Sequence, residues 1–173
     1  LRAEKITCRL RHLIYSTTSI KKGEYLSSAS VIQGIEIKYE DEIFEITLPC
    51  LLPKRKQKQG TEFLLDPFTN ALAQYAKTHP MPEMQHCVVC FCHVYDKALP
   101  ERRIRDYDNL ELKQYLDVAT SFILPDDSGL LCDAYNTTEL GQQDCTRITI
   151  MDSKRFPDWL DARQNALQSI TDL

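Results

Sequence analysis

The feature that most constrains the fold is an apolar run near the middle of the chain, from His86 to Tyr95 (HCVVCFCHVY). The run has the length of a strand, is rich in valine and aromatic residues, and is apolar at consecutive positions rather than at alternate ones. A strand that is apolar on both sides lies inside a sheet whose two faces are covered. We therefore expect residues 86–95 to form a central strand with helices packed over it.

Alternating patterns predict the other strands of this sheet. Residues 35–39 and 44–48 alternate apolar and polar side chains on either side of Asp41 and Glu42, which is typical of a β-hairpin. Pro49 and Pro53 end the second of these strands. Two further strands are expected at residues 130–135 and 147–151.

Helical spacing of apolar residues predicts four helices. In the first, Ile6, Leu10, Leu13 and Ile14 form an apolar stripe. The four expected helices cover residues 1–19, 66–79, 109–124 and 157–171.

Local signals set the expected helix ends. Asp66 and Pro67 supply an N-cap and a first-turn proline, Pro125 ends the third helix, and Pro157 opens the last. Gly23 and the serines after it interrupt the pattern before the hairpin. The predicted fold class is α/β in the broad sense (α+β): a single domain over residues 1–173, with a mixed β-sheet core at about 43–151 and extra helices at both ends.

Bulk properties favour a cytoplasmic protein. No apolar run approaches the roughly 20 residues that cross a bilayer, and the first residues lack the apolar core of a signal peptide. The seven cysteines are odd in number, and three of them crowd into the central run, which suits reduced thiols. The chain begins with Leu1 rather than methionine, so residues can precede it.

The chain is acidic overall but contains two basic patches. The net charge of −4 counts against extensive contact with nucleic acid. The patches could nevertheless bind phosphate, although a solvated loop is the alternative for both. The candidate nucleic-acid-binding residues are Lys54, Arg55, Lys56 and Lys58 in one patch and Arg102, Arg103 and Arg105 in the other.

Acidic side chains follow the second patch. In an extended segment Asp106 and Asp108 would project to the same side, and Asp126 and Asp127 return from a later turn. Carboxylates in such a cluster are the ligands that Mg²⁺ prefers. The alternative is structural: Asp108 is a good N-cap with Glu111 completing a capping box, and Pro-Asp-Asp-Ser-Gly is an ordinary turn sequence.

The order of elements from about Phe44 to Ile150 resembles the RusA family of Holliday junction resolvases. The stretch from Asp127 to Met151 and the terminal helices resemble a bacterial, mobile-element-associated branch. The matching residues are Arg102, Arg103, Arg105, Asp106, Asp108, Asn109, Leu110, Asp117, Asp126 and Asp127.

The resemblance implies a Mg²⁺-dependent homodimer, with Mn²⁺ as a substitute metal, that nicks branched DNA during recombination and repair. It implies that Asp106, Asp108 and Asp127 are catalytic metal ligands, with Asp126 as an alternate ligand. We expect the protein to associate with no membrane and to use no small-molecule cofactor.

One family residue is displaced. The family has a functional lysine four residues after the second aspartate, where this chain has Leu112, and Lys113 follows it. On a helix that step is a rotation of about 100°, so Lys113, the catalytic candidate, need not reach the site. The displaced lysine and the acidic charge leave a second hypothesis open. The chain would then be a catalytically inactive protein that keeps the fold as a binding or assembly module of a mobile element.

The central run also contains Cys87, Cys90, Cys92 and His93, residue types that bind zinc. On a strand, however, Cys87 and His93 point away from Cys90 and Cys92, and no second pair stands at zinc-site spacing. We therefore expect buried, reduced cysteines and no zinc.

Overall fold

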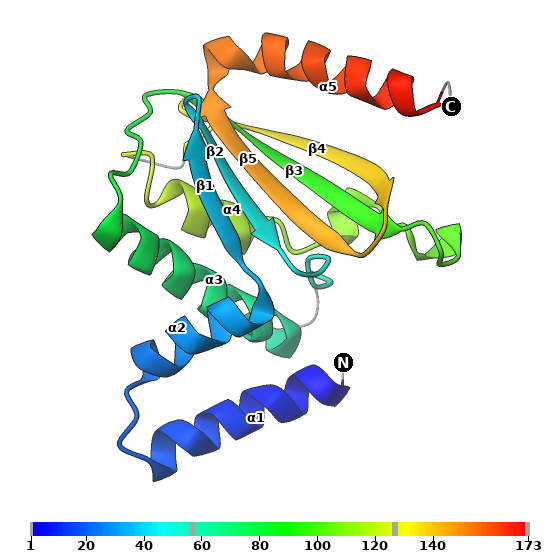
Figure 1. Ribbon diagram of the computed structural model, residues 1–173. Helices are drawn as coiled ribbons and strands as arrows, with labels where there is room; N and C mark the ends of the chain where they lie inside the picture. Colours follow the sequence, from blue (N-terminus) through cyan, green and yellow to red (C-terminus); the bar gives the residue numbers. More distant parts are fainter. Residues whose placement is uncertain (1, 56–57, 126–127, 172–173) are drawn as a thin grey trace.

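The structure is a computed structural model that describes residues 2–55, 58–125 and 128–171. These residues form an α+β fold, with helices α1 to α5, strands β1 to β5 and short 3₁₀ helices η1 to η3 (Figure 1). In chain order the elements are α1 (Arg2–Thr17), α2 (Lys22–Gln33), β1 (Glu36–Glu40), β2 (Ile43–Leu48), α3 (Lys58–Thr78), β3 (Cys87–Asp96), η1 (Glu101–Arg103), η2 (Tyr107–Asn109), α4 (Lys113–Thr120), β4 (Cys132–Gly141), β5 (Cys145–Asp152), η3 (Ser153–Arg155) and α5 (Phe156–Thr171).

The strands form one mixed sheet in the order β1-β2-β5-β3-β4. Strand β3 pairs with β5 antiparallel on one side and with β4 parallel on the other. All nine residues from Cys87 to Tyr95 are buried. The prediction of a mixed sheet with residues 86–95 inside it is therefore confirmed.

The predicted hairpin is also present. Strands β1 and β2 pair antiparallel, with Glu40 opposite Ile43. Asp41 and Glu42 have φ angles of 50° and 61°. Two consecutive left-handed residues form the tight turn whose twist matches that of the flanking strands.

Helices cover both faces of the sheet (Figure 1). On one face Val89 and Phe91 of β3 belong to a core that includes Phe68 of α3 and Tyr115 of α4. On the other face Val88 and Cys90 pack with Phe156 and Trp159 of α5. The alternation along β3 thus supplies two separate apolar layers.

Several predicted helix bounds are wrong. The residues after Gly23 do not interrupt helical structure but form α2. This helix ends at Gly34, which has the left-handed conformation (φ 74°) that glycine favours. The helix predicted at 109–124 is replaced by η2 and the short α4. Strand β4 runs to Gly141, well beyond the predicted end of that strand at residue 135.

The largest difference concerns Pro67, which lies inside α3 rather than in its first turn. A proline has no N–H, so the carbonyl four residues earlier, that of Phe63, loses its helical partner. The Arg11 guanidinium of α1 donates to this oxygen at 3.0 Å. A long-range contact therefore allows the helix to continue through the proline.

Helix α1 packs with its polar side toward α3. Arg11 is 6% exposed, whereas Ile6, Leu10 and Leu13 of the predicted apolar stripe are 57%, 53% and 55% exposed. Within the described ranges, no helix is both long enough and apolar enough to span a membrane.

Candidate functional site

The acidic motif lies in the segment that joins β3 to α4. Asp106 has extended backbone angles (φ −63°, ψ 144°), and Asp108 lies within η2. Both residues are exposed. The prediction that one extended segment carries both carboxylates is therefore wrong, because the 3₁₀ turn ends the strand-like alternation at Asp106.

The predicted capping box is not formed. Helix α4 begins at Lys113, so its N-cap position is Leu112, which makes no side-chain cap. The Glu111 N–H instead donates to the Pro53 carbonyl at 2.9 Å. Asp108 is thus not engaged as the N-cap of α4, and the structural alternative for this residue does not hold.

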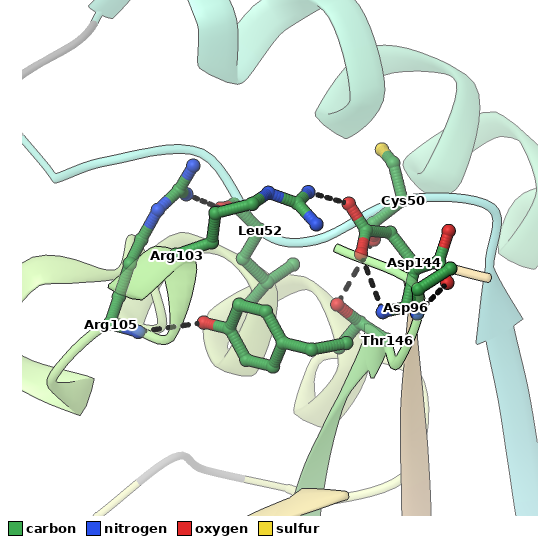
Figure 2. Close-up of polar contacts among 9 residues, drawn as sticks. Cys50, Leu52, Asp96, Arg103, Arg105, Asp144 and Thr146 are labelled. Carbon is green, nitrogen blue, oxygen red and sulfur yellow. Dashed lines mark hydrogen bonds and ion pairs between the residues drawn. The ribbon is translucent and has the colours of Figure 1, made fainter. Parts of the chain in front are cut away.

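Hydrogen bonds anchor this segment to the end of the sheet (Figure 2). The Arg105 N–H donates to the Tyr95 hydroxyl at 3.1 Å, and the Arg105 guanidinium donates to the Leu52 carbonyl at 3.2 Å. Arg103 forms an ion pair with Asp144. Two of the three arginines predicted to bind DNA therefore make contacts within the protein, while Arg102 is exposed.

Asp144 joins this anchor to β3. Its carboxylate accepts a hydrogen bond from the Asp96 N–H at 2.9 Å. Burial alone would raise the pKa of Asp144, but the Asp96 N–H and the Arg103 guanidinium, with the nearby charge of Arg105, lower it below its ordinary value. Asp144 is therefore ionised at neutral pH. The sequence gives no local motif that marks it, because its partners are far away in the chain.

A short antiparallel bridge brings the first basic patch to the acidic motif. Lys54 pairs with Leu110, and the Arg55 N–H donates to the Asn109 carbonyl at 3.1 Å. Lys54 and Arg55 are exposed beside this bridge. Lys56 and the side chain of Lys58 lie outside the described residues. The first basic patch and the acidic motif, some 50 residues apart in sequence, thus meet at one place.

A cavity of about 260 Å³ opens at this meeting point. Three charged side chains predicted to act in the site line it together: Arg55, Asp108 and Lys113. The rest of the lining is Phe91, Tyr107, Leu110, Glu111, Leu112, Leu116, Ala134 and Asn136. Among the described residues, the lining does not include Asp106.

The structure does not show the rotation that the one-residue shift of Lys113 along a helix predicts. Because α4 begins only at Lys113, the residues before it are not helical, and the shift by one position is not a rotation of about 100°. Lys113 reaches the cavity, and its ammonium donates to Asp117 one helical turn later at 2.7 Å.

A buried histidine lies beneath the acidic motif. His93 is fully buried, and its ring lies 5.6 Å from that of Tyr107, the residue between the two aspartates. Neither ring nitrogen has a hydrogen-bond partner in the described parts of the chain. Burial lowers the pKa of His93 to about 4, although the Asn136 amide offsets part of that effect. Sequence reasoning weighed His93 as a zinc ligand and missed this position.

The cysteines of β3 divide between the two faces of the sheet as the alternation predicts. Cys87 belongs to the core under α3 and α4, and Cys90 to the core under α5. Burial raises the pKa of Cys90 to about 12 and that of Cys92 to about 11. These two thiols are therefore protonated at neutral pH. The absence of zinc stays a prediction.

The proposed metal ligands are only partly placed. Asp126 and Asp127 lie outside the described residues, so two of the four carboxylates have a position. No group of three potential ligands is found within the ranges that the structure covers. The exposed carboxylates of Asp106 and Asp108 are hard oxygen donors of the type that suits Mg²⁺.

Comparisons with known proteins add a family to this description. None of the curated proteins matches the chain. One protein family, described as a family of unknown function (DUF6100), matches residues 1–173. Because the match spans the whole sequence, the chain belongs to the DUF6100 family.

Proposed function

We propose that the protein is a Mg²⁺-dependent endonuclease that acts on branched DNA. The observation that carries the proposal is the shared cavity of Asp108, Lys113 and Arg55. A carboxylate beside two cationic side chains suits a phosphodiester, because the metal and the cations neutralise charge on the same group. The exposed Lys54 beside the cavity supplies a further phosphate contact.

Each residue has a proposed task. Asp106, Asp108 and Asp127 would hold the metal, with Asp126 as an alternate ligand. When bound, Mg²⁺ would activate water and stabilise the charge on the phosphate. Lys113 would contact a phosphate oxygen, and Asp117, which accepts its hydrogen bond, would hold the ammonium in place.

The substrate class and assembly rest on the resemblance to the RusA family. A four-way junction is symmetric, so two active sites related by a two-fold axis would match it. We therefore expect a homodimer that acts on DNA in the cytoplasm during recombination or repair. Light scattering should give a dimer mass at micromolar concentration, and a monomer throughout that range would contradict the assembly.

The test of the activity is cleavage of a synthetic four-way junction with Mg²⁺ or Mn²⁺. Asp108→Asn should abolish cleavage, and Lys113→Gln should slow it by roughly a hundredfold. Asp158→Asn and Lys97→Gln are matched controls, since both residues are exposed and lie outside the cavity. Equal activity of Asp108→Asn and Asp158→Asn would refute the proposal.

Melting with and without Mg²⁺ tests the metal site independently of catalysis. Clustered aspartates repel one another, so Asp106→Asn and Asp127→Asn should leave the metal-free melting temperature unchanged or slightly higher. Both variants should lose the stabilisation by Mg²⁺ that the unsubstituted protein shows. No Mg²⁺ effect on the unsubstituted protein would count against the metal site.

A second candidate is a catalytically inactive binding or assembly protein of a mobile element. It is favoured by the internal contacts of Arg103 and Arg105 and by the net charge of −4, which reduce the positive charge available to DNA. This candidate predicts no cleavage of any junction with either metal. The same cleavage assay therefore separates the two functions.

A further inference from the structure

A second, larger cavity lies between the N-terminal helices and α3, away from the candidate nuclease site. Its volume is about 820 Å³. Polar and charged residues of α1, α2 and α3 contribute to its lining. They include Arg9, Arg11, His12, Tyr15, Lys22 and Asp66.

Arg11 is the unusual member of this lining, because a guanidinium that is 6% exposed normally has a carboxylate partner. One of its N–H groups donates to the Phe63 carbonyl, which Pro67 leaves without a helical partner. The guanidinium also lies 5.0 Å from the centre of the Phe63 ring. These contacts use one donor and one face of the group, but neither supplies a negative charge.

Two buried donors beside this group lack a hydrogen-bond partner in the described residues. In the described part of the chain, the Arg11 Nε and the Tyr15 hydroxyl are buried without a hydrogen-bond partner, and no carboxylate pairs with Arg11. Burial raises the pKa of Tyr15, and the charge of Arg11 offsets part of that effect. The phenol is therefore protonated at neutral pH, and its hydroxyl proton has no acceptor in the described residues.

The charge balance of the lining is positive. Among the described residues of the lining, Arg9, Arg11 and Lys22 outnumber Glu62 and Asp66 by one charge when His12 is neutral. Asp66 is already paired with Lys22 at 3.2 Å. The acidic groups of the cavity thus do not neutralise Arg11 by direct contact.

We propose that this cavity binds a small organic anion through an oxyanion group held by Arg11 and Tyr15. The group is a carboxylate or a phosphate, since the guanidinium fork and a hydroxyl suit both. The volume falls within the range of small-molecule sites and exceeds the need of a bare ion, so the ligand carries an organic body.

This inference goes beyond the proposed nuclease and does not depend on it. The cavity is built from α1, α2 and α3, whereas the candidate nuclease site is built around η2, α4 and the edge of β4. Arg11→Gln should therefore leave junction cleavage unchanged, and a loss of cleavage by itself would say nothing about the anion.

The experiment follows the Nε–H signal of Arg11 by NMR in the full chain. The probes are inorganic phosphate, acetate and adenosine monophosphate, each titrated at constant ionic strength with chloride as the reference salt. We expect a saturable shift of this signal with at least one probe. A larger response to the phosphate probes or to acetate identifies the oxyanion. No saturable shift with any of the three would overturn the proposal.

Two variants test the assigned donors by calorimetric titration with the probe that binds most tightly. Arg11→Gln keeps an amide donor for the Phe63 carbonyl but removes the charge, and it should weaken binding at least about tenfold. Tyr15→Phe removes only a hydroxyl, so it tests the site even if Arg11→Gln fails to fold, and it should weaken binding roughly fivefold. Lys97→Gln is the control, because Lys97 is exposed and lies outside the cavity. Unchanged affinity in Tyr15→Phe, or in a folded Arg11→Gln, would refute the assignment.

Discussion

The sheet and the N-terminal helix α1 bury opposite kinds of side chain. In the sheet, Phe44 and Ile148 are fully buried. In α1, by contrast, Leu10 is 53% exposed and Arg11 is 6% exposed. Both regions contain regular apolar patterns, but the apolar residues of the pattern are buried in the sheet and exposed in α1.

The difference shows what an apolar pattern can and cannot specify. A period of 3.6 residues establishes that a segment is helical, but the neighbouring element decides which side of that helix is covered. Here the neighbour is α3, in which Pro67 leaves the Phe63 carbonyl in need of a donor, and Arg11 supplies one. In the sheet, Phe44 and Ile148 instead lie in an apolar core.

The largest effect is expected in the sheet core. Phe44→Ala should lower the free energy of unfolding by about 3–5 kcal/mol, because it removes a fully buried ring that packs against Tyr39 and Tyr75. Urea unfolding measures the change. Ile32→Ala on α2 is the matched control, since that side chain is 85% exposed and should contribute less than about 0.5 kcal/mol. Similar losses in both variants would contradict the prediction that burial in the sheet core sets the size of the effect.

The next effect is a pH dependence that originates in the sheet. The pKa of His93 is about 4 in the folded chain and 6.5 in the absence of burial. As the pH falls from 6.5 to 4, the unfolded chain gains a proton that the folded chain does not bind, so stability is lost in this window, by about 3 kcal/mol at most. Unfolding curves between pH 4 and 7 measure this loss.

The assignment of the pH effect to His93 has its own control. His93→Phe removes the titrating group and should flatten the curve in that window, whereas His79→Gln, which removes an exposed imidazole, should leave the slope as it is. An unchanged slope in His93→Phe would show that other groups cause the acid sensitivity.

A smaller effect is expected where the sheet holds the acidic segment. Asp144→Ala removes the carboxylate that pairs with Arg103 and accepts the hydrogen bond of the Asp96 N–H. Both interactions are partly exposed to solvent. The free energy of unfolding should fall by about 1–2 kcal/mol. Asp158→Ala on α5 should change it by less than about 0.5 kcal/mol and serves as the control. If the two variants match, the anchor contributes nothing to stability.

The contact between α1 and α3 can be tested with a double-mutant cycle. Arg11→Met leaves the Phe63 carbonyl without a donor, but in a Pro67→Ala background the new N–H of residue 67 can bond that oxygen. Arg11→Met should therefore cost about 1 kcal/mol less in the Pro67→Ala background than in the original chain. Equal costs in both backgrounds would show that the guanidinium does not replace the missing helical bond.

Much of the sheet could be predicted because its determinants are local. The apolar run of β3 and the alternation around Asp41 and Glu42 specify strands without reference to the rest of the chain. The error at Pro67 has the opposite cause. A proline after an aspartate is a good helix start, and the donor that satisfies the Phe63 carbonyl inside the longer helix is more than 50 positions away.

The candidate site was predictable in its residue types but not in its arrangement. The acidic motif and the basic patch were identified from composition, yet the bridge between Lys54 and Leu110 that joins them is a tertiary contact. His93 was missed because nothing in a buried apolar run distinguishes a histidine that packs under a functional loop from one that fills the core.

The smallest effect is expected for the exposed apolar stripe of α1. It tests most directly whether α1, unlike the sheet, leaves its apolar residues exposed. Leu10→Gln on α1 replaces an apolar side chain that is 53% exposed, so in an isolated chain it should change the free energy of unfolding by less than about 0.5 kcal/mol. The measurement is urea unfolding at two protein concentrations, one at least a hundredfold higher than the other. His12→Gln, on an exposed position of the same helix, controls for helix propensity. A loss that grows with protein concentration would contradict the prediction, because it would mean that a second copy covers this stripe and that α1 buries its apolar side after all.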